Sequence, residues 1–141
     1  MGIEGSRAIV HIYFEQLWNQ GNLDVADSIV TPNYVLHDPN FLFGDLNGPE
    51  GLKQFVRVNR TAFPDIHFSI EDQIAEGNKM GTRWVATGTH DGIYMGIAPT
   101  GNRITVAGFA LHHLEGSKIV EEWVNYAALD LLRQLGLYLP S

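Results

Sequence analysis

Two adjacent histidines, His112 and His113, are the residues of this sequence best suited by type to proton transfer. An imidazole titrates near neutral pH and can both accept and donate a proton. Side chains alternate along a strand, so the two rings point to opposite faces of a sheet and at most one faces a cavity. His113 shares a predicted face with Phe109 and Leu111, which makes it the candidate catalytic residue. A hydrogen-bonded core histidine is the competing interpretation.

Other polar side chains lie near strand ends. Asn125 shares a face with Trp123 and could bind a carbonyl or enolate oxygen, or simply be a satisfied polar group at a strand end. His37 ends a short strand beside a loop, a common place for functional groups, whereas the neighbouring Asp38 is predicted to have turn and capping roles. Trp84 and His90 share a face that turns either to a pocket or to the helices. The predicted substrate-binding residues are His37, Trp84, His90, Phe109, Leu111 and Trp123.

The remaining motifs favour no metal or cofactor chemistry. The six histidines form no His-x-His or HExxH pattern, and the chain has no cysteine. No glycine-rich phosphate loop precedes a helix, and no nucleophile elbow is present. The sequence therefore predicts acid–base chemistry by side chains in an apolar pocket, with no cofactor and no metal.

Composition limits the class of protein. A chain of 141 residues is predicted to form one domain, residues 1–141, with a substantial core. A formal charge of −7 argues against a nucleic-acid or anionic-membrane partner. No apolar run reaches the roughly 20 residues of a membrane span. No signal pattern is seen at the N-terminus, so a cytoplasmic location is expected.

The periodicity changes from helical to alternating along the chain. Helices are predicted over Ser6 to Gln20, Leu23 to Val30, Gly48 to Ala62 and Ala128 to Leu135. Strands are predicted over Tyr34 to His37, Ile66 to Asp72, Met80 to His90, from Ile104 to the turn at Glu115, and over Lys118 to Tyr126. This order indicates an α+β fold: a curved antiparallel sheet forming an apolar cone that helices cap.

Two surfaces are expected to make contacts. The triplet Phe41-Leu42-Phe43 in the loop before the third helix is either a lid, a partner contact or part of the core rim. Val106, Ala110, His112 and Val124 are assigned to the outer face of the sheet, which would be too apolar for water. A homo-oligomer is therefore predicted.

Several strings resemble the SnoaL-like polyketide (ester) cyclase family. They are HDP from His37, GPEGLK from Gly48, AFPDIHF from Ala62, THDGIYMGIAPTGNRI from Thr89, GSKIVEEW from Gly116 and the terminal LLRQLG. The resemblance implies a nuclear transport factor 2-like fold and a cofactor-free aldol cyclisation of an aromatic polyketide precursor, often a methyl ester. It also places a family histidine at His113, and it implies a small apolar or polycyclic ligand.

One position departs from that family pattern. The aspartate that acts as acid and base in the family falls on Ala127, which can neither accept nor donate a proton. Three interpretations follow: another base such as His113, loss of the chemistry, or an engineered alanine. The alternatives to a cyclase are a non-catalytic binding protein and another acid–base reaction on the same fold, such as an isomerase, dehydratase or epoxide hydrolase.

Overall fold

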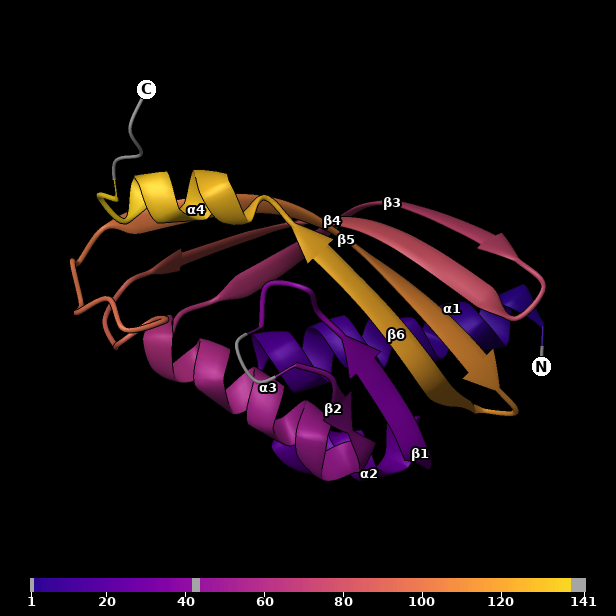
Figure 1. The fold of residues 1–141 in the computed structure, drawn as a ribbon. Helices are drawn as coiled ribbons and strands as arrows, with labels where there is room; N and C mark the ends of the chain where they lie inside the picture. The colour runs from indigo at the N-terminus through magenta and orange to yellow at the C-terminus, as the bar shows by residue number, and fades with distance from the viewer. Residues whose placement is uncertain (1, 42–43, 138–141) are drawn as a thin grey trace.

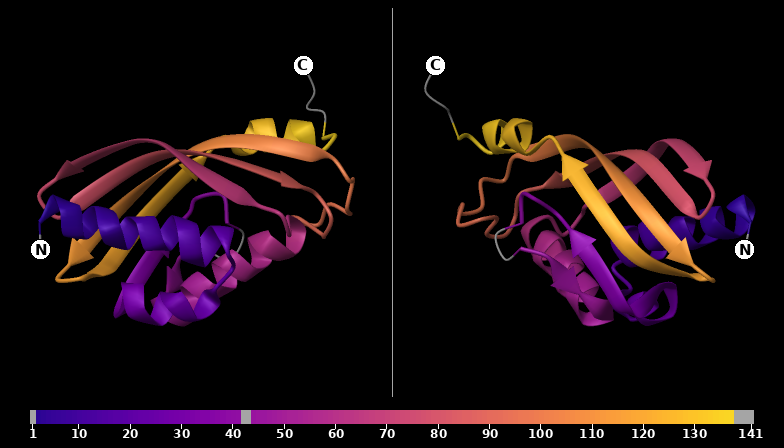
Figure 2. Two further views of the ribbon diagram at one scale, coloured as in Figure 1. Left: turned by 180° about the vertical axis from the view of Figure 1, so that it is seen from behind. Right: turned by 45° about the vertical axis from the view of Figure 1, so that its right-hand side comes forward.

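A curved six-stranded sheet arches over the N-terminal helices (Figure 1). The computed structural model describes residues 2–41 and 44–137. The strand order is β2-β1-β6-β5-β4-β3. The predicted α+β fold is confirmed, with the concave face of the sheet turned to the helices (Figure 2).

The helices follow the predicted amphipathic segments, with differences at their ends. They are α1 (Ile3–Ile12), the π-helix η1 (Tyr13–Asn19), the 3-10 turn η2 (Leu23–Val25), α2 (Ala26–Ile29), α3 (Gly48–Ala62) and α4 (Ala128–Gln134). The first predicted helix is thus an α-helix continued by a π-helix. Helix α3 has the predicted bounds, because Pro49 suits its first turn and Pro64 follows its end.

The strands form a mixed sheet. They are β1 (Val30–His37), β2 (Leu46–Asn47), β3 (His67–Glu76), β4 (Lys79–Thr89), β5 (Arg103–Glu115) and β6 (Lys118–Tyr126). Strands β3 to β6 are antiparallel, as predicted. Strand β1, however, pairs in parallel with β6, with Leu36 opposite Glu122. The sequence pattern of a single short strand carries no information about its partner or its direction.

The inner face of the sheet is the one that carries the even-numbered residues of β4 and β5. Trp84 lies over Gly108 on this face: a Cβ at Gly108 would sit 2.2 Å from Trp84 Cζ2. Val106, Ala110, His112 and Val124 are all buried there. Their assignment to the outer face was therefore wrong. A glycine next to a large ring is what allows the aromatic side chain to cover the neighbouring strand.

Polar contacts fix the helices to the sheet. The Asn19 side chain, at the end of η1, donates to Phe68 O at 3.0 Å and accepts from Phe68 N at 2.7 Å, which binds it to β3. Arg60 on α3 donates a 2.6 Å hydrogen bond to Trp18 O. This second contact joins α3 to η1, and α3 forms one wall of a cavity.

The predicted lid triplet is described only in part. Phe41 packs edge-on against Phe55 of α3, with ring centroids 5.3 Å apart. Leu42 and Phe43 lie outside the described residues.

Candidate active site

A cavity lies between the inner face of the sheet and α3, in two compartments. The outer compartment has a volume of about 240 Å³ and is bordered by the segment after β1, by α3, by the loop after β4 and by the end of β6. The inner compartment, of about 60 Å³, reaches Trp84. Phe55, Asn59, Tyr94 and Tyr126 border both compartments, so the two lie side by side.

The walls of this cavity are almost entirely apolar. Around the inner compartment they comprise Phe55, Phe63, Ile66, Phe68, Trp84, Ala86, Ile104, Val106, Val124 and Leu131. At the mouth, Val58 and Met95 are 37% and 40% exposed, so the outer compartment opens to solvent. Apolar walls with few polar groups are typical of small-molecule sites, and they strengthen any electrostatic interaction made inside.

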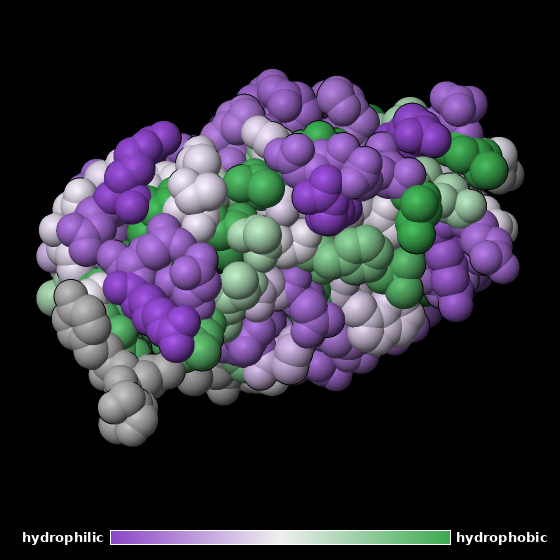
Figure 3. All heavy atoms as spheres, turned by 90° about the horizontal axis from the view of Figure 1, so that it is seen from above, coloured by the Kyte–Doolittle hydropathy of each residue, from purple (hydrophilic) through white to green (hydrophobic). Residues whose placement is uncertain are grey.

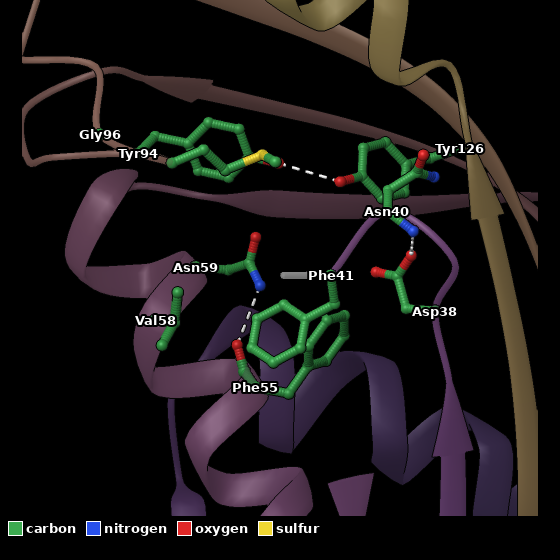
Figure 4. Close-up of a pocket in the computed structure, with 10 residues that line it drawn as sticks. Asp38, Asn40, Phe41, Phe55, Val58, Asn59, Tyr94, Gly96 and Tyr126 are labelled. Carbon is green, nitrogen blue, oxygen red and sulfur yellow. Dashed lines mark hydrogen bonds between the residues drawn. The ribbon is translucent and has the colours of Figure 1, made fainter. Parts of the chain in front are cut away.

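Asp38 brings a carboxylate to the outer compartment. It follows β1 directly, is 4% exposed, and accepts a 2.8 Å hydrogen bond from Asn40 N–H at Oδ1. Its second oxygen points away from Asn40 toward the cavity (Figure 4). Burial raises the pKa of Asp38, the Asn40 hydrogen bond opposes this, and the charge of Glu122 adds to the rise. A buried carboxyl group with a raised pKa in a cleft is suited to accept and return a proton.

Two tyrosine hydroxyls form the second polar feature. The Tyr94 and Tyr126 hydroxyl oxygens lie 3.0 Å apart, within hydrogen-bonding distance (Figure 4). Tyr94 comes from the loop after β4, and Tyr126 is the last residue of β6. Burial raises the pKa of both hydroxyls, and the charge of Asp38 raises each of them further. Both groups are therefore neutral near pH 7 and can donate hydrogen bonds.

Asn59 completes the polar lining from α3. Its Nδ2 donates a 2.9 Å hydrogen bond to Phe55 O, one turn earlier in the helix. This contact holds the side chain so that its oxygen is turned toward the Tyr94 side of the cavity (Figure 4). Asn40 also borders the outer compartment, so its polar residues are Asp38, two asparagines and two tyrosines in an apolar enclosure.

A second group of polar residues is buried in the core near this site. Glu122 accepts hydrogen bonds from Tyr13 and Tyr34, the latter at 2.5 Å, and its Oε2 lies 3.3 Å from His112 Nε2. Burial, followed by the charge of Glu122, raises the pKa of both tyrosines well above its usual value. Two neutral donors therefore satisfy a wholly buried carboxylate, whose charge acts on Asp38.

The comparisons with known proteins bear on this site. The model of the SnoaL-like polyketide cyclase family matches residues 8–135. The chain belongs to that family. Among curated proteins, none matches the sequence. The match covers every element except the first turns of α1, so the cavity described above lies within the family domain.

Solved structures agree with this membership. A candidate polyketide cyclase from Acidithiobacillus ferrooxidans has 29% identity and a TM-score of 0.84 over 96% of this chain and 98% of its own. IdmH, a candidate polyketide cyclase from Streptomyces antibioticus, has 25% identity and a TM-score of 0.81 over 94% and 99%. A SnoaL-like protein from Jannaschia sp. CCS1 shares the fold, with a TM-score of 0.87 at 22% identity over 96% and 94%.

In this SnoaL-like chain, the side chains predicted from the hairpin face away from the cavity. His113 is partly exposed and contacts the Asn78 side chain at 3.0 Å, at the turn between β3 and β4. Phe109 is 39% exposed, Leu111 is half-buried, and Asn125 is exposed. Their expected position on the concave face was therefore wrong. Both faces of β5 are rich in apolar residues. The face that packs against η1 is the one that carries His112, which contacts Tyr13.

The other predicted residues have different environments. Trp123 also faces outward, stacked on His37 with centroids 5.4 Å apart. The His37 nitrogens contact Glu121 at 2.6 Å and Asp45 at 3.0 Å, which raises the pKa of this imidazole. Of the predicted binding residues, Trp84 is the one that lines the cavity.

His90 and Ala127 do not border the cavity either. His90 is fully buried and accepts a 3.2 Å hydrogen bond from Thr100 N–H at Nδ1, while Nε2 has no partner in the described part of the chain. Ala127 is exposed and is the N-cap of α4. Its backbone continues the pairing with β5 through a 3.0 Å hydrogen bond to Ala107 O.

Sequence reasoning missed most of the polar lining. Tyr94 lies within the string THDGIYMGIAPTGNRI that carries the family resemblance, but nothing in its spacing marks it as a lining residue, and Asn59 lies in no such string. Tyr126 shares parity with Val124 and Glu122 on β6, so a correct assignment of the inner face would have included it. Asp38 was given a turn role, which its contact with Asn40 confirms, but its second oxygen serves the cavity.

Two further findings concern residues 2–41 and 44–137. Within them, no group of three or more His, Asp or Glu side chains is arranged to hold a metal ion. In the same ranges, no helix has the length and apolar character needed to cross a bilayer.

Proposed function

We propose that this protein catalyses a cofactor-free intramolecular aldol cyclisation of a small polyketide-like molecule, with Asp38 as the proton-transfer group. The observation that supports this most is the nearly buried Asp38 carboxylate, with one oxygen held and the other turned to an apolar cavity. Family membership favours the cyclase reaction over other acid–base reactions. In this proposal Asp38 takes over the task that the family assigns to the position of Ala127.

The proposed reaction needs one group that accepts a proton and later returns it. The Asp38 carboxylate takes a proton from a carbon flanked by carbonyl groups, and the electron pair of the broken C–H bond forms an enolate. The enolate carbon attacks a ketone of the same molecule, which forms the C–C bond and an alkoxide. The Asp38 carboxylic acid then protonates the alkoxide, so the product is an isomer of the substrate and the enzyme is restored.

Cavity size limits the ligand. A cavity of about 150 Å³ holds benzene, so the outer compartment of about 240 Å³ has room for roughly two fused rings. A larger polycyclic molecule would extend through the mouth beside Val58 and Met95. The ligand class that fits is a flat, apolar molecule with carbonyl oxygens at one edge.

Turnover of a panel of aromatic polyketide methyl esters tests the proposal. Asp38→Asn keeps the shape of the side chain but cannot accept the proton, so the rate should fall by about 10²–10⁴. Asp91→Asn, a change at an exposed carboxylate, is the matched control and should keep the parent rate. Full activity of Asp38→Asn would remove Asp38 from the mechanism. Tight binding of the panel without turnover would favour the binding-protein alternative.

We also propose that the protein forms a homodimer through the outer face of the sheet. Figure 3 views this face, where apolar side chains lie among polar ones. Phe109 and Ile74 are 39% and 72% exposed, and their strands flank a groove that Leu111 also lines. Sedimentation of the parent should show a dimer, and Phe109→Lys should shift it toward the monomer. A monomeric parent at micromolar concentration would contradict the proposal.

A further inference from the structure

The Tyr94–Tyr126 hydroxyl pair has hydrogen-bonding capacity that the protein itself does not use. The two hydroxyls carry two protons, and only one is needed for the 3.0 Å contact between them. Within the described residues, neither hydroxyl has another hydrogen-bond partner. Both side chains border both compartments of the cavity. One O–H donor is thus available to an oxygen atom of a bound ligand.

The pair is held rigidly, from two separate parts of the chain. Tyr94 closes a tight turn with Ile97, through Tyr94 N to Ile97 O at 3.0 Å and Ile97 N to Tyr94 O at 2.8 Å. Met95 in this turn has a φ of +48°, a backbone conformation that L-residues rarely adopt and that is common at functional sites. The Tyr94 ring packs on Phe63, 5.3 Å between centroids, and Tyr126 is fixed in β6 opposite Gly108.

The electrostatic state of the pair suits a donor to a developing negative charge. Burial keeps both hydroxyls protonated near neutral pH, because it raises the pKa of each. Asp38, Tyr94 and Tyr126 all border the outer compartment, so a ligand bound there can contact both the carboxylate and the pair. Figure 4 shows the tyrosine pair above Phe41 and Phe55, with Asp38 to the right and below Tyr126. A preorganised donor in a water-poor site stabilises an oxyanion more than the same donor in water.

We propose that the Tyr94–Tyr126 pair is an oxyanion site that donates a hydrogen bond to the carbonyl oxygen of a fused-ring ketone or phenol. In the reaction, which rests on the proposed function, this oxygen becomes the enolate oxygen when Asp38 removes the adjacent proton. The C–H electron pair forms the C=C bond of the enolate, and the π pair of the carbonyl group moves onto this oxygen. The two tyrosine hydroxyls stabilise the resulting charge by hydrogen bonding, without transferring a proton. The ligand class is therefore one with an enolisable or phenolic oxygen on a flat apolar frame.

A purely structural role is the competing explanation. The Tyr94–Tyr126 contact could serve only to fix the loop after β4 to the sheet. Such a contact would affect stability, but it would not distinguish a ligand with a hydroxyl from one without it. The test therefore compares 2-naphthol with naphthalene, which has the same rings and no oxygen.

Binding of both probes is measured by fluorescence titration at neutral pH, with no turnover involved. The parent should prefer 2-naphthol over naphthalene, and Tyr94→Phe and Tyr126→Phe should each lower this preference about tenfold. Tyr34→Phe, a buried tyrosine outside the cavity lining, should leave it unchanged. The excitation spectrum should show that the parent lowers the pKa of bound 2-naphthol, and that both cavity variants lose this effect.

The two proposals fail differently. Equal preference for 2-naphthol in the parent and in both cavity variants overturns the oxyanion site, as does failure of the folded parent to prefer 2-naphthol. Melting curves show which variants are folded, and either tyrosine variant alone suffices for the comparison. Loss of the Asp38 role would appear in the turnover assay only, because the naphthol preference does not depend on proton abstraction.

Discussion

Leu36 on β1 and Glu122 on β6 are register partners in the parallel ladder that joins the first strand to the last. Asp38 follows two residues after Leu36, so this pairing carries it past Glu122 to the level of the cavity. Two buried carboxyl groups thus lie near each other, one satisfied by tyrosines and one turned to the ligand space. Burial raises the pKa of Asp38, and the negative charge of Glu122 adds to this rise.

Asp38→Asn should stabilise the protein at neutral pH. The folded-state pKa of Asp38 is raised by burial, so the folded protein binds this proton more tightly than the unfolded chain does. Asp38 therefore lowers the free energy of unfolding as pH rises through its unfolded and then its folded pKa. The melting temperature of Asp38→Asn should exceed that of the parent at about pH 8, and the difference should vanish near pH 3. A melting temperature of Asp38→Asn below that of the parent at pH 8 would show that the charged Asp38 carboxylate does not destabilise the folded protein.

The tyrosines on Glu122 should contribute strongly to stability. Tyr13→Phe and Tyr34→Phe each remove a hydrogen bond to a buried carboxylate, which we expect to cost about 2 kcal/mol. Tyr94→Phe, which removes a hydrogen bond to a neutral hydroxyl, is the control and should cost about 1 kcal/mol or less. Urea denaturation measures the three values. If Tyr34→Phe lowered the free energy of unfolding by no more than Tyr94→Phe does, the hydrogen bonds to Glu122 would not be a major source of stability.

His37 should stabilise the protein more in mild acid than in base. Its hydrogen bond to Glu121 is the main reason that its pKa is raised, and Asp45 contacts the other nitrogen. This stabilisation is complete below the unfolded pKa and is lost as pH rises through the folded pKa. His37→Gln should therefore lower the melting temperature more at about pH 6 than at about pH 9. His67→Gln, a change at an exposed histidine on β3, is the control, and equal behaviour of the two variants would argue against the contact.

Ala127→Asp should stabilise the protein and add no activity. The family resemblance places the acid–base aspartate at this position. Ala127 is instead exposed at the N-cap of α4, which has no side-chain cap. An aspartate at an N-cap adds about 0.5–2 kcal/mol, with further help from the helix dipole. Thermal melts and turnover of the variant check both parts, and a gain in turnover would place the family aspartate back at this position.

The sequence by itself determined the elements and the family. The amphipathic pattern of 48–62 predicted α3 with its correct ends, and the alternation after Pro64 predicted four strands in the right order. Local periodicity suffices here, because each pattern reports the face that one element buries. The strings THDGIYMGIAPTGNRI and LLRQLG predicted the SnoaL-like family. The family match over residues 8–135 confirmed this prediction.

Tertiary structure alone decided which face of the sheet is inner and which residues meet in the cavity. Phe109 and Leu111 look as apolar in sequence as Val106 and Ala110, and only the packing of Tyr13 on His112 shows which set is inside. A bulge between His113 and Leu114 also shifts the register with β6, which simple alternation cannot show. The outer compartment joins side chains from four separate segments. Their meeting depends on strand pairing and helix packing over the whole chain, not on local periodicity.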